Sequence, residues 1–249
     1  YFLKFQNRLQ KKVMKKVDLI YVATLASKNI WENEAKCPVV NRLYVMDHGP
    51  WVKQNKFEAR DALGLPSAKK IILLSSRLEK KKGILEVLYA YSKLFESQKN
   101  LLLVISGVED NTAYSQRLQF TVKKLKLQDG VIFTGWVTDE ELLLYYNAAD
   151  LFISNSMAED GPISSMKALS LDVPLISTDV GRVAEIMKEL NLGSVIQPGD
   201  TKSLAIEINR NLRASKYQKT RDIAKKCFSW DSRFEISIRN YDDLSSKYY

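Results

Sequence analysis

Two basic residues and one carboxylate have the types and positions needed for chemistry on an anionic ligand. Arg77 and Lys82 flank a basic loop that follows one apolar run, and Glu159 lies in an acidic loop that follows another. An Arg and a Lys that converge at a strand end would neutralise a diphosphate, and the Arg can bind two oxygens at once. The residues alone leave open the alternative that the basic loop and the carboxylate are merely solvated.

The segment after Glu159 is a second candidate for anion binding. Gly161 and Pro162 form a turn, and Ser164 and Ser165 follow where a helix is expected to begin. The unpaired N–H groups and the dipole at a helix N-terminus both favour phosphate. The sequence therefore predicts an anion site where a strand, a loop and a helix start follow one another.

A parallel sheet is the element that can bring these residues together. From residue 70 onward, short apolar runs alternate with helical patterns, which predicts an α/β fold with a doubly wound, Rossmann-like parallel sheet. Ligands of such sheets bind at the carboxyl ends of the strands. The predicted strands are 71–76, 101–106, 131–134, 151–154, 174–177 and 194–196, and the predicted helices include 84–95, 118–127, 201–212, 217–227 and 232–244.

The part of the chain before residue 70 is less regular. Residues 1–16 have apolar side chains at helical spacing and many lysines, so they predict a basic amphipathic helix. This helix either attaches to anionic lipid or packs on its own sheet with its lysines solvated. Strands are predicted at 19–23 and 43–46, a short helix ends near Trp31, and 51–62 is charged without strand character.

Composition narrows the class of protein. The chain has 249 residues, a net charge of +9 and 45% hydrophobic residues, with no apolar run long enough to span a membrane. Cys37 and Cys227 have no metal-ligand spacing, so we expect reduced thiols in a cytoplasmic protein, and the initial Tyr suggests a start inside a longer protein. No zinc spacing, Ser/His/Asp triad or phosphate-binding Gly-Lys-Ser loop is visible, and no nucleic-acid motif accompanies the positive charge.

The order of these motifs resembles the donor-binding signature of retaining GT-B glycosyltransferases, which use nucleotide sugars to build glycans. In that family a second Glu lies eight residues after the first, and the next strand ends in a Thr-Asp-Val-Gly-Gly-like loop. Glu159 and 162–166 match, whereas Lys167 replaces the second Glu and Arg182 replaces the second Gly. The resemblance divides the chain into the tail of an acceptor domain (1–47), a linker (48–68), a donor domain (69–227) and a crossover helix (228–249).

The resemblance also implies roles for individual residues. Arg77 and Lys82 would hold the nucleoside diphosphate and stabilise the departing charge, so that no metal and no cofactor is required. Glu159 would contact the hydroxyls of the donor sugar, and His48 would lie in the hinge. The remaining binding residues would be the main chain of Gly135 and Val137 beside the base, Gly161 in the turn, and the N–H groups of Ser164 and Ser165 at the phosphates.

Lys167 is the chief departure from the family signature. The missing Glu accepts hydrogen bonds from both ribose hydroxyls, and a lysine has donors but no acceptor. Its loss is expected to cost about 1–3 kcal/mol of binding, and Lys167→Glu is expected to recover it. Alternatively, Lys167 reaches a phosphate or is a surface residue.

The resemblance thus implies a sugar transfer with retention of configuration. The donor would be a nucleotide sugar, and the acceptor a glycan or a lipid-linked molecule. The protein would be cytoplasmic and would contact an anionic membrane peripherally. The alternatives are a catalytically impaired GT-B-like binding or regulatory subunit, favoured by Lys167, and an unrelated doubly wound nucleotide-binding protein.

Overall fold

The structure is a computed structural model of the whole chain. It describes residues 12–13, 16–41, 44–108, 112–215 and 217–246. The chain forms two compact units, one made of 1–46 with 226–249 and the other of 47–225. Each unit is described by itself.

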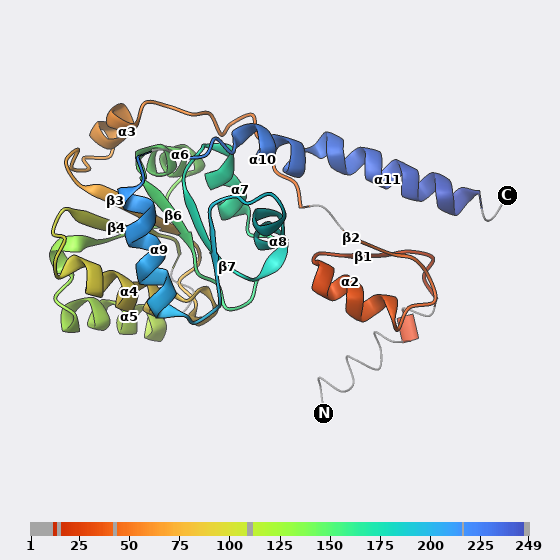
Figure 1. Cartoon of the computed structure of the whole chain (residues 1–249), viewed down its shortest axis with the longest axis horizontal. Helices are drawn as coiled ribbons and strands as arrows, with labels where there is room; N and C mark the ends of the chain where they lie inside the picture. Colours follow the sequence, from red (N-terminus) through yellow and green to blue (C-terminus); the bar gives the residue numbers. More distant parts are fainter. Residues whose placement is uncertain (1–11, 14–15, 42–43, 109–111, 216, 247–249) are drawn as a thin grey trace. The chain divides into compact units, whose positions relative to one another are not determined.

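The larger unit contains a six-stranded sheet in which every paired strand is parallel (Figure 1). The strand order is β5-β4-β3-β6-β7-β8, so the chain moves outward from β3 in one direction and then returns to start again beside β3. This confirms the predicted doubly wound sheet, and the switch point between β3 and β6 is where ligands bind in such folds. The strands are β3 (Lys70–Ser75), β4 (Leu101–Ser106), β5 (Val131–Gly135), β6 (Leu151–Ser154), β7 (Leu175–Thr178) and β8 (Ser194–Ile196).

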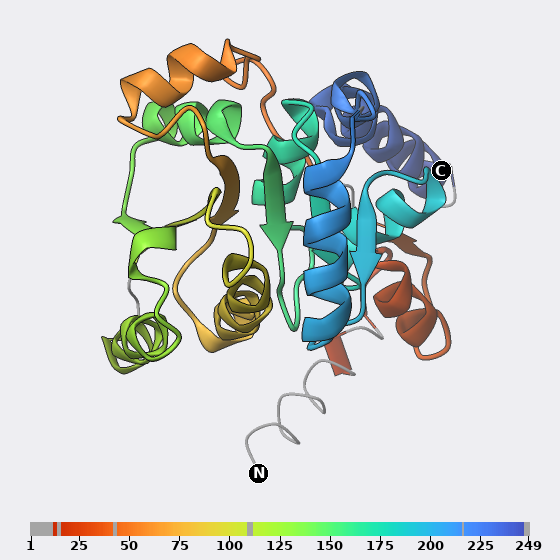
Figure 2. The same ribbon diagram turned by 60° about the vertical axis from the view of Figure 1, so that its left-hand side comes forward.

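Helices cover both faces of this sheet (Figure 2). Side chains of α4 (Ile84–Phe95), α5 (Thr112–Lys124) and α9 (Thr201–Arg213) form one buried cluster with strand residues that include Ile153. Phe152 points to the opposite face, because successive side chains of a strand alternate. There it stacks on Tyr146 of α6 (Asp139–Ala148), with 5.1 Å between the ring centroids.

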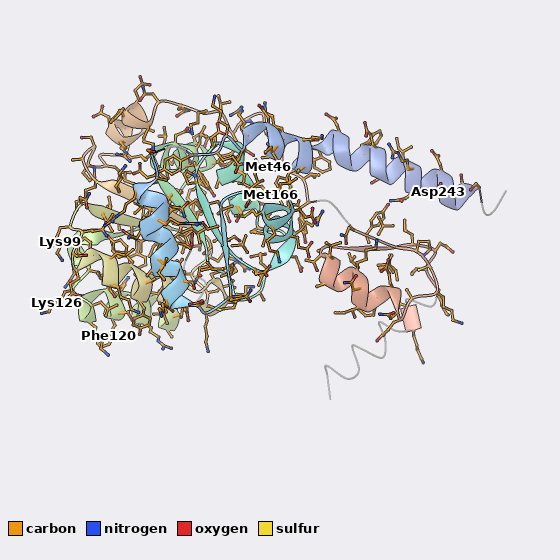
Figure 3. The ribbon with its side chains drawn as sticks, in the orientation of Figure 1. Met46, Lys99, Phe120, Lys126, Met166 and Asp243 are labelled. Atoms are coloured by element: carbon orange, nitrogen blue, oxygen red, sulfur yellow. The ribbon has the colours of Figure 1, made fainter. Side chains whose placement is uncertain are left out.

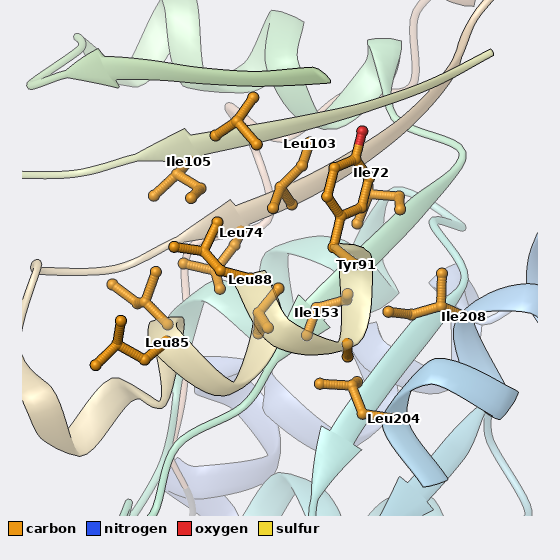
Figure 4. Close-up of a cluster of buried hydrophobic side chains, with 14 of the residues drawn as sticks. Ile72, Leu74, Leu85, Leu88, Tyr91, Leu103, Ile105, Ile153, Leu204 and Ile208 are labelled. Carbon is orange, nitrogen blue, oxygen red and sulfur yellow. The ribbon is translucent and has the colours of Figure 1, made fainter. Parts of the chain in front are cut away.

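The buried cluster explains why most residues of the central strands are apolar. Leu74 from β3 and Ile105 from β4 pack against Leu88 and Tyr91 of α4, while Ile208 joins from α9 (Figure 4). The Tyr91 hydroxyl donates to the Gly130 carbonyl oxygen at 2.7 Å, so its one polar atom is satisfied inside the core. A sheet buried on both faces needs such continuous apolar strands.

The segment expected as a linker contains a helix that is fastened to the larger unit. Asn55 caps α3 (Lys56–Ala62), which lies beside α6 (Figure 2). The buried Arg60 donates to Asp150 Oδ2 at 2.7 Å and to the Ala148 carbonyl oxygen at 3.0 Å. Residues 55–62 are therefore a packed element, a feature that their charged composition concealed.

Two helices begin or end away from their predicted positions. The helix α5 ends at Lys124 and not at residue 127, since Lys126 adopts a left-handed φ of 54°. The helix α10 (Arg221–Phe228) starts after 217, because Asp172 Oδ1 accepts the N–H groups of Thr220 and Arg221 at 2.7 and 2.9 Å and caps the helix there. A distant side chain thus sets this start.

The smaller unit has a parallel pair of strands, β1 (Ile20–Val22) and β2 (Val39–Asn41), joined by α2 (Leu25–Glu32). The strand expected at 43–46 is wrong over the part that the structure describes, because residues 44–46 form no strand and the Met46 N–H donates to the Phe228 carbonyl oxygen at 3.0 Å. The unit also holds α11 (Trp230–Ser245). Most of the basic helix predicted at 1–16 lies outside the described residues.

Candidate active site

Two loops meet at the switch point between β3 and β6. The loop after β3 contains a short 3-10 helix, Lys80–Lys82, which Gly83 ends in a left-handed conformation with φ of 63°. The Asn155 side chain donates to the Gly83 carbonyl oxygen at 2.8 Å, and the Met157 N–H donates to the Lys81 carbonyl oxygen at 2.7 Å. These hydrogen bonds hold the basic loop against the loop that follows β6.

This arrangement brings the predicted cation and carboxylate together. Lys82 Nζ forms an ion pair with Glu159 Oε2, and the two side chains are only 17% and 20% exposed. Both line a small pocket of about 20 Å³ at the carboxyl ends of β3 and β6. The other lining residues are Leu74, Ser75, Ser76, Ile153, Ser154, Asn155, Ser156, Pro162 and Ser164.

The acidic loop is held from its other side by the start of α8 (Gly181–Glu189). Gly181 approaches so closely that a Cβ there would stand 2.8 Å from the Glu159 carbonyl oxygen, and the Arg182 N–H donates to the Asp160 carbonyl oxygen at 2.7 Å. The Arg182 guanidinium pairs along its own helix with Glu185 at 3.0 Å and Glu189. Arg182, which stands where the family signature has a second Gly, therefore still holds the acidic loop, because its backbone N–H makes the contact with Asp160.

Arg77 lies apart from this pocket. Its guanidinium pairs with Glu79 at 2.8 Å, and Lys81 pairs with the same carboxylate at 3.0 Å. The Arg77 side chain is 57% exposed. Arg77 is not among the residues that line the pocket. The structure thus brings Lys82 to Glu159 and leaves Arg77 on the rim of the basic loop.

The start of α7 (Ile163–Ser170) offers fewer donors than the sequence suggested. The Ser165 N–H donates to the Pro162 carbonyl oxygen at 3.0 Å, so it is used inside its own turn. Ser164 lines the pocket, and its carbonyl oxygen accepts from the Tyr146 hydroxyl at 2.9 Å. Met166, labelled in Figure 3, is fully buried beneath this turn. Of the two serines, Ser164 is the one placed at the pocket.

Lys167 is neither a surface residue nor a member of this pocket. Its Nζ lies 3.7 Å from the centre of the Trp51 ring and 3.1 Å from Asp139 Oδ1. The Lys167 side chain is 16% exposed. Burial lowers the pKa of Lys167 from its usual value, and the hydrogen bond and charge of Asp139 oppose that shift.

The loop after β5 carries the two residues predicted beside the base. Gly135 has φ of 68°, and its carbonyl oxygen accepts from the Gly107 N–H at 3.0 Å. The half-buried Val137 follows, and the Thr138 side chain caps α6 through its hydrogen bond with the Glu141 N–H at 3.2 Å. The predicted base loop therefore leads directly into the helix whose first residue, Asp139, meets Lys167.

Other predicted features lie elsewhere or have structural roles. His48 Nδ1 is 3.0 Å from the Ser170 hydroxyl and lines no part of the pocket beside Lys82. Gly161 separates Asp160 from the turn that opens α7. A larger pocket of about 220 Å³ lies at the opposite, amino end of β7 and β8, so we place the site at the smaller pocket with the paired charges.

Sequence reasoning missed several residues that shape the site. Asn155 fastens the basic loop, while Trp51 and Asp139 hold Lys167. A polar Asn directly after an apolar strand was the available signal for Asn155. No local pattern marks Trp51 as a partner of Lys167. Within the described parts of the chain, no helix is long and apolar enough to cross a membrane, and no three His, Cys, Asp or Glu residues are grouped as metal ligands.

Fold and pocket together define a doubly wound α/β protein with a paired cation and carboxylate at the ligand-binding edge of its sheet. The family model of glycosyl transferases group 1 matches residues 55–227, and the chain belongs to this family. The family predicted from the sequence motifs is thereby confirmed.

Curated relatives match only part of this chain and part of themselves. The alpha-monoglucosyldiacylglycerol synthase of Streptococcus pneumoniae is 35% identical over 51% of this chain and 29% of its own length. The putative teichuronic acid biosynthesis glycosyltransferase TuaC of Bacillus subtilis is 35% identical over 64% of this chain and 37% of its own length. The chain therefore spans about a third of the length of these relatives.

Solved structures share the fold at lower identity. The sucrose-phosphate synthase of Thermosynechococcus elongatus has a TM-score of 0.84 at 21% identity and covers 98% of this chain, which spans 62% of that protein. Anabaena HepE, solved in complex with UDP and glucose, has a TM-score of 0.77 at 20% identity over 96% of this chain and 66% of its own. At these identities the likeness concerns the fold.

Proposed function

We propose that this chain is the donor-binding part of a glycosyltransferase that moves a sugar from a nucleotide sugar to a glycan or lipid-linked acceptor with retention of configuration. The observation that carries the proposal is the ion pair between Lys82 and Glu159 at the switch point of the sheet. A cation for the diphosphate and a carboxylate for sugar hydroxyls stand side by side where ligands of this fold class bind. Membership of the family supports the same reading.

Binding of the donor would exchange the partners of these two residues. A diphosphate carries more negative charge than one carboxylate, so it would take over the Lys82 ammonium and release Glu159. The released carboxylate would then accept hydrogen bonds from the donor sugar. Arg77 would add its charge if its guanidinium turned from Glu79 toward the phosphates. Both cations would stabilise the negative charge that builds up on the leaving diphosphate.

The acceptor is proposed from the names of the relatives. One is a synthase of a glucosylated diacylglycerol, and another is assigned to teichuronic acid biosynthesis. A glycan or lipid-linked acceptor fits both names. With such an acceptor we also propose a cytoplasmic location and peripheral contact with an anionic membrane. The second candidate function is a GT-B-like binding or regulatory subunit without transfer activity. It is favoured by the residue type at position 167, where a lysine stands and the family signature has a carboxylate.

Calorimetric titration with UDP, GDP and ADP tests the proposal directly. We expect one of them to bind, and Lys82→Ala to weaken that binding by about tenfold or more, as the loss of a charged hydrogen bond does. Lys80→Ala is the matched control, because Lys80 lies in the same loop and is exposed. If none of the three nucleotides binds at millimolar concentration, the proposal is wrong.

Sugar transfer itself distinguishes the enzyme from the binding subunit. The full-length protein would be incubated with radiolabelled nucleotide sugars and a membrane extract as the source of acceptor. An enzyme incorporates label, and Lys82→Ala removes most of the incorporation while Lys80→Ala retains it. A protein that binds the nucleotide tightly but never incorporates or hydrolyses a sugar is the binding subunit.

A further inference from the structure

The pair formed by Lys167 and Asp139 joins two helices at the ligand edge of the sheet. Asp139 is the first residue of α6, directly after the loop that follows β5, and Lys167 lies in the second turn of α7. Lys167 Nζ is 3.1 Å from Asp139 Oδ1. The two side chains differ sharply in exposure, since 16% of the Lys167 side chain but 75% of the Asp139 side chain is accessible to solvent.

Lys167 is held in position by aromatic side chains. Its ammonium lies 3.7 Å from the centre of the Trp51 ring, which is a favourable distance for a cation–π contact. Trp51 is itself buried and meets Tyr146 edge to face, with 5.9 Å between the ring centroids. Tyr146 then stacks on Phe152 of β6. The lysine is therefore anchored through this aromatic series to the central sheet.

Asp139 presents a carboxylate oxygen toward solvent. Its Oδ1 receives the Lys167 ammonium, and among the described residues its Oδ2 has no hydrogen-bond partner. A carboxylate accepts several hydrogen bonds, whereas a lysine accepts none. Lys167 therefore orients the Asp139 carboxylate, which accepts hydrogen bonds, although the lysine itself accepts none. A neighbouring vicinal diol is the kind of ligand group that donates two hydrogen bonds to one carboxylate.

The position of this carboxylate suits the sugar of a nucleotide. Ser164 lines the proposed diphosphate pocket, and Lys167 follows it on α7 by three residues, a rise of about 4.5 Å along a helix. In a nucleoside diphosphate the ribose follows directly after the first phosphate. A diphosphate bound over the mouth of that pocket, which is itself too small to enclose one, would therefore place its ribose within reach of the next turn of α7, where Asp139 approaches from α6.

From this geometry we infer that Asp139 is the acceptor for the ribose hydroxyls of the bound nucleotide, and that Lys167 is a positioning residue that holds it there. The inference rests on the proposed function above. It accounts for how a chain with lysine at position 167 would recognise ribose: the carboxylate would lie on α6 in place of α7, and Lys167 would hold it.

The test compares UDP with 2′,3′-dideoxy-UDP on wild type and Asp139→Ala, or the corresponding pair for whichever base the wild type binds. We expect Asp139→Ala to weaken ribonucleotide binding by about tenfold, as expected for a charged hydrogen bond. The affinity for the dideoxynucleotide should change by less than about twofold, because its sugar has no hydroxyl that could donate a hydrogen bond to Asp139. Glu140→Ala is the matched control, since Glu140 is the next residue, equally charged and exposed. Melting temperatures of all variants verify folding.

Lys167→Glu provides an independent arm of the experiment. Alone, it places a second carboxylate against Asp139 and removes the contact with Trp51, so it is expected to weaken UDP binding. This reverses the expectation from the family signature, in which Glu at this position accepts from the ribose. Adding Asp139→Asn removes the repulsion and leaves a single carboxylate on α7. The double variant is expected to regain a preference for UDP over the dideoxynucleotide.

Three results would overturn the inference while leaving the proposed function intact. Asp139→Ala could weaken the binding of both nucleotides equally, or leave the binding of both unchanged. It could also tighten binding, because the freed Lys167 reaches a phosphate. In each case the wild type still binds a nucleoside diphosphate through Lys82, but Asp139 is not its ribose acceptor. A wild type that binds no nucleotide instead removes the proposed function and this inference together.

Discussion

Gly83 lies so close to Asn155 that a Cβ at position 83 would stand 2.1 Å from the Asn155 carbonyl oxygen. This contact joins the basic loop after β3 to the loop after β6, and it sets Lys82 beside Glu159. Glycine is required for two separate reasons, because the residue also has a left-handed φ of 63°. The packing of two backbones therefore underlies the pairing of the two charges.

Gly83→Ala is predicted to destabilise the fold and to weaken nucleotide binding. The left-handed conformation costs about 1–2 kcal/mol for a residue with a Cβ, and relief of the clash adds to that cost. Gly64→Ala is the control, since Gly64 has φ of 62° but nothing within 4 Å of the added Cβ. Chemical denaturation should give a clearly larger loss of unfolding free energy for Gly83→Ala. Equal losses in the two variants would show that the contact with Asn155 yields easily.

Glu159→Gln is predicted to separate recognition of the diphosphate from recognition of the sugar. Removing the carboxylate frees Lys82, so binding of UDP should tighten by about two- to tenfold, the value of one modest polar contact. UDP-glucose should lose whatever advantage it has over UDP, because the acceptor for its sugar hydroxyls is weakened. Calorimetry with both ligands measures the ratio. A uniform loss of affinity for both would mean that Glu159 contacts the nucleotide and not the sugar.

Asp150→Ala is predicted to be among the more destabilising substitutions outside the site. Asp150 Oδ2 accepts from Arg60 and from the Ile71 N–H, both at 2.7 Å, and the Asp150 and Arg60 side chains are buried. Leaving the Arg60 charge without its partner should cost about 3–5 kcal/mol of unfolding free energy. Asp61→Ala, an exposed change on the same helix, is the control.

The same carboxylate predicts a pH dependence of stability. Burial acts to raise the pKa of Asp150, but the Ile71 N–H and the charges of Lys56 and Arg60 outweigh it and lower the pKa overall. A lowered pKa in the folded state means that its stabilisation is complete above the unfolded value, near pH 4, and is lost as pH falls through the folded value. Asp150→Asn should flatten this acid limb in denaturation curves. An unchanged acid limb would assign it to other carboxylates.

The strands illustrate what local sequence determines well. Leu101–Ser106 is apolar up to its last residue, Ser106, and is buried on both faces, so its pattern alone predicts a central parallel strand. The pattern failed where a distant partner sets the boundary. The strand that pairs with β1 is Val39–Asn41, whereas residues 44–46, which belong to the predicted strand 43–46, form no strand. Burial selects apolar residues along a core strand, so the strand is visible in the local sequence. The ends of an edge strand depend on which residues of the partner strand are available for hydrogen bonding, and the local sequence does not contain this information.

The site shows the same division between local pattern and tertiary packing. The order of Lys82, Glu159 and Ser164 along the chain, with their strand and helix patterns, was enough to predict a shared pocket at one edge of the sheet. Residue types alone did not determine that Arg77 pairs with Glu79, or that Lys167 lies between Trp51 and Asp139. A parallel sheet determines which strand ends lie together, so the order of strands and motifs in the sequence predicts where a site forms. The partner of each long charged side chain depends on packing between distant helices and loops, and only the tertiary structure decided it.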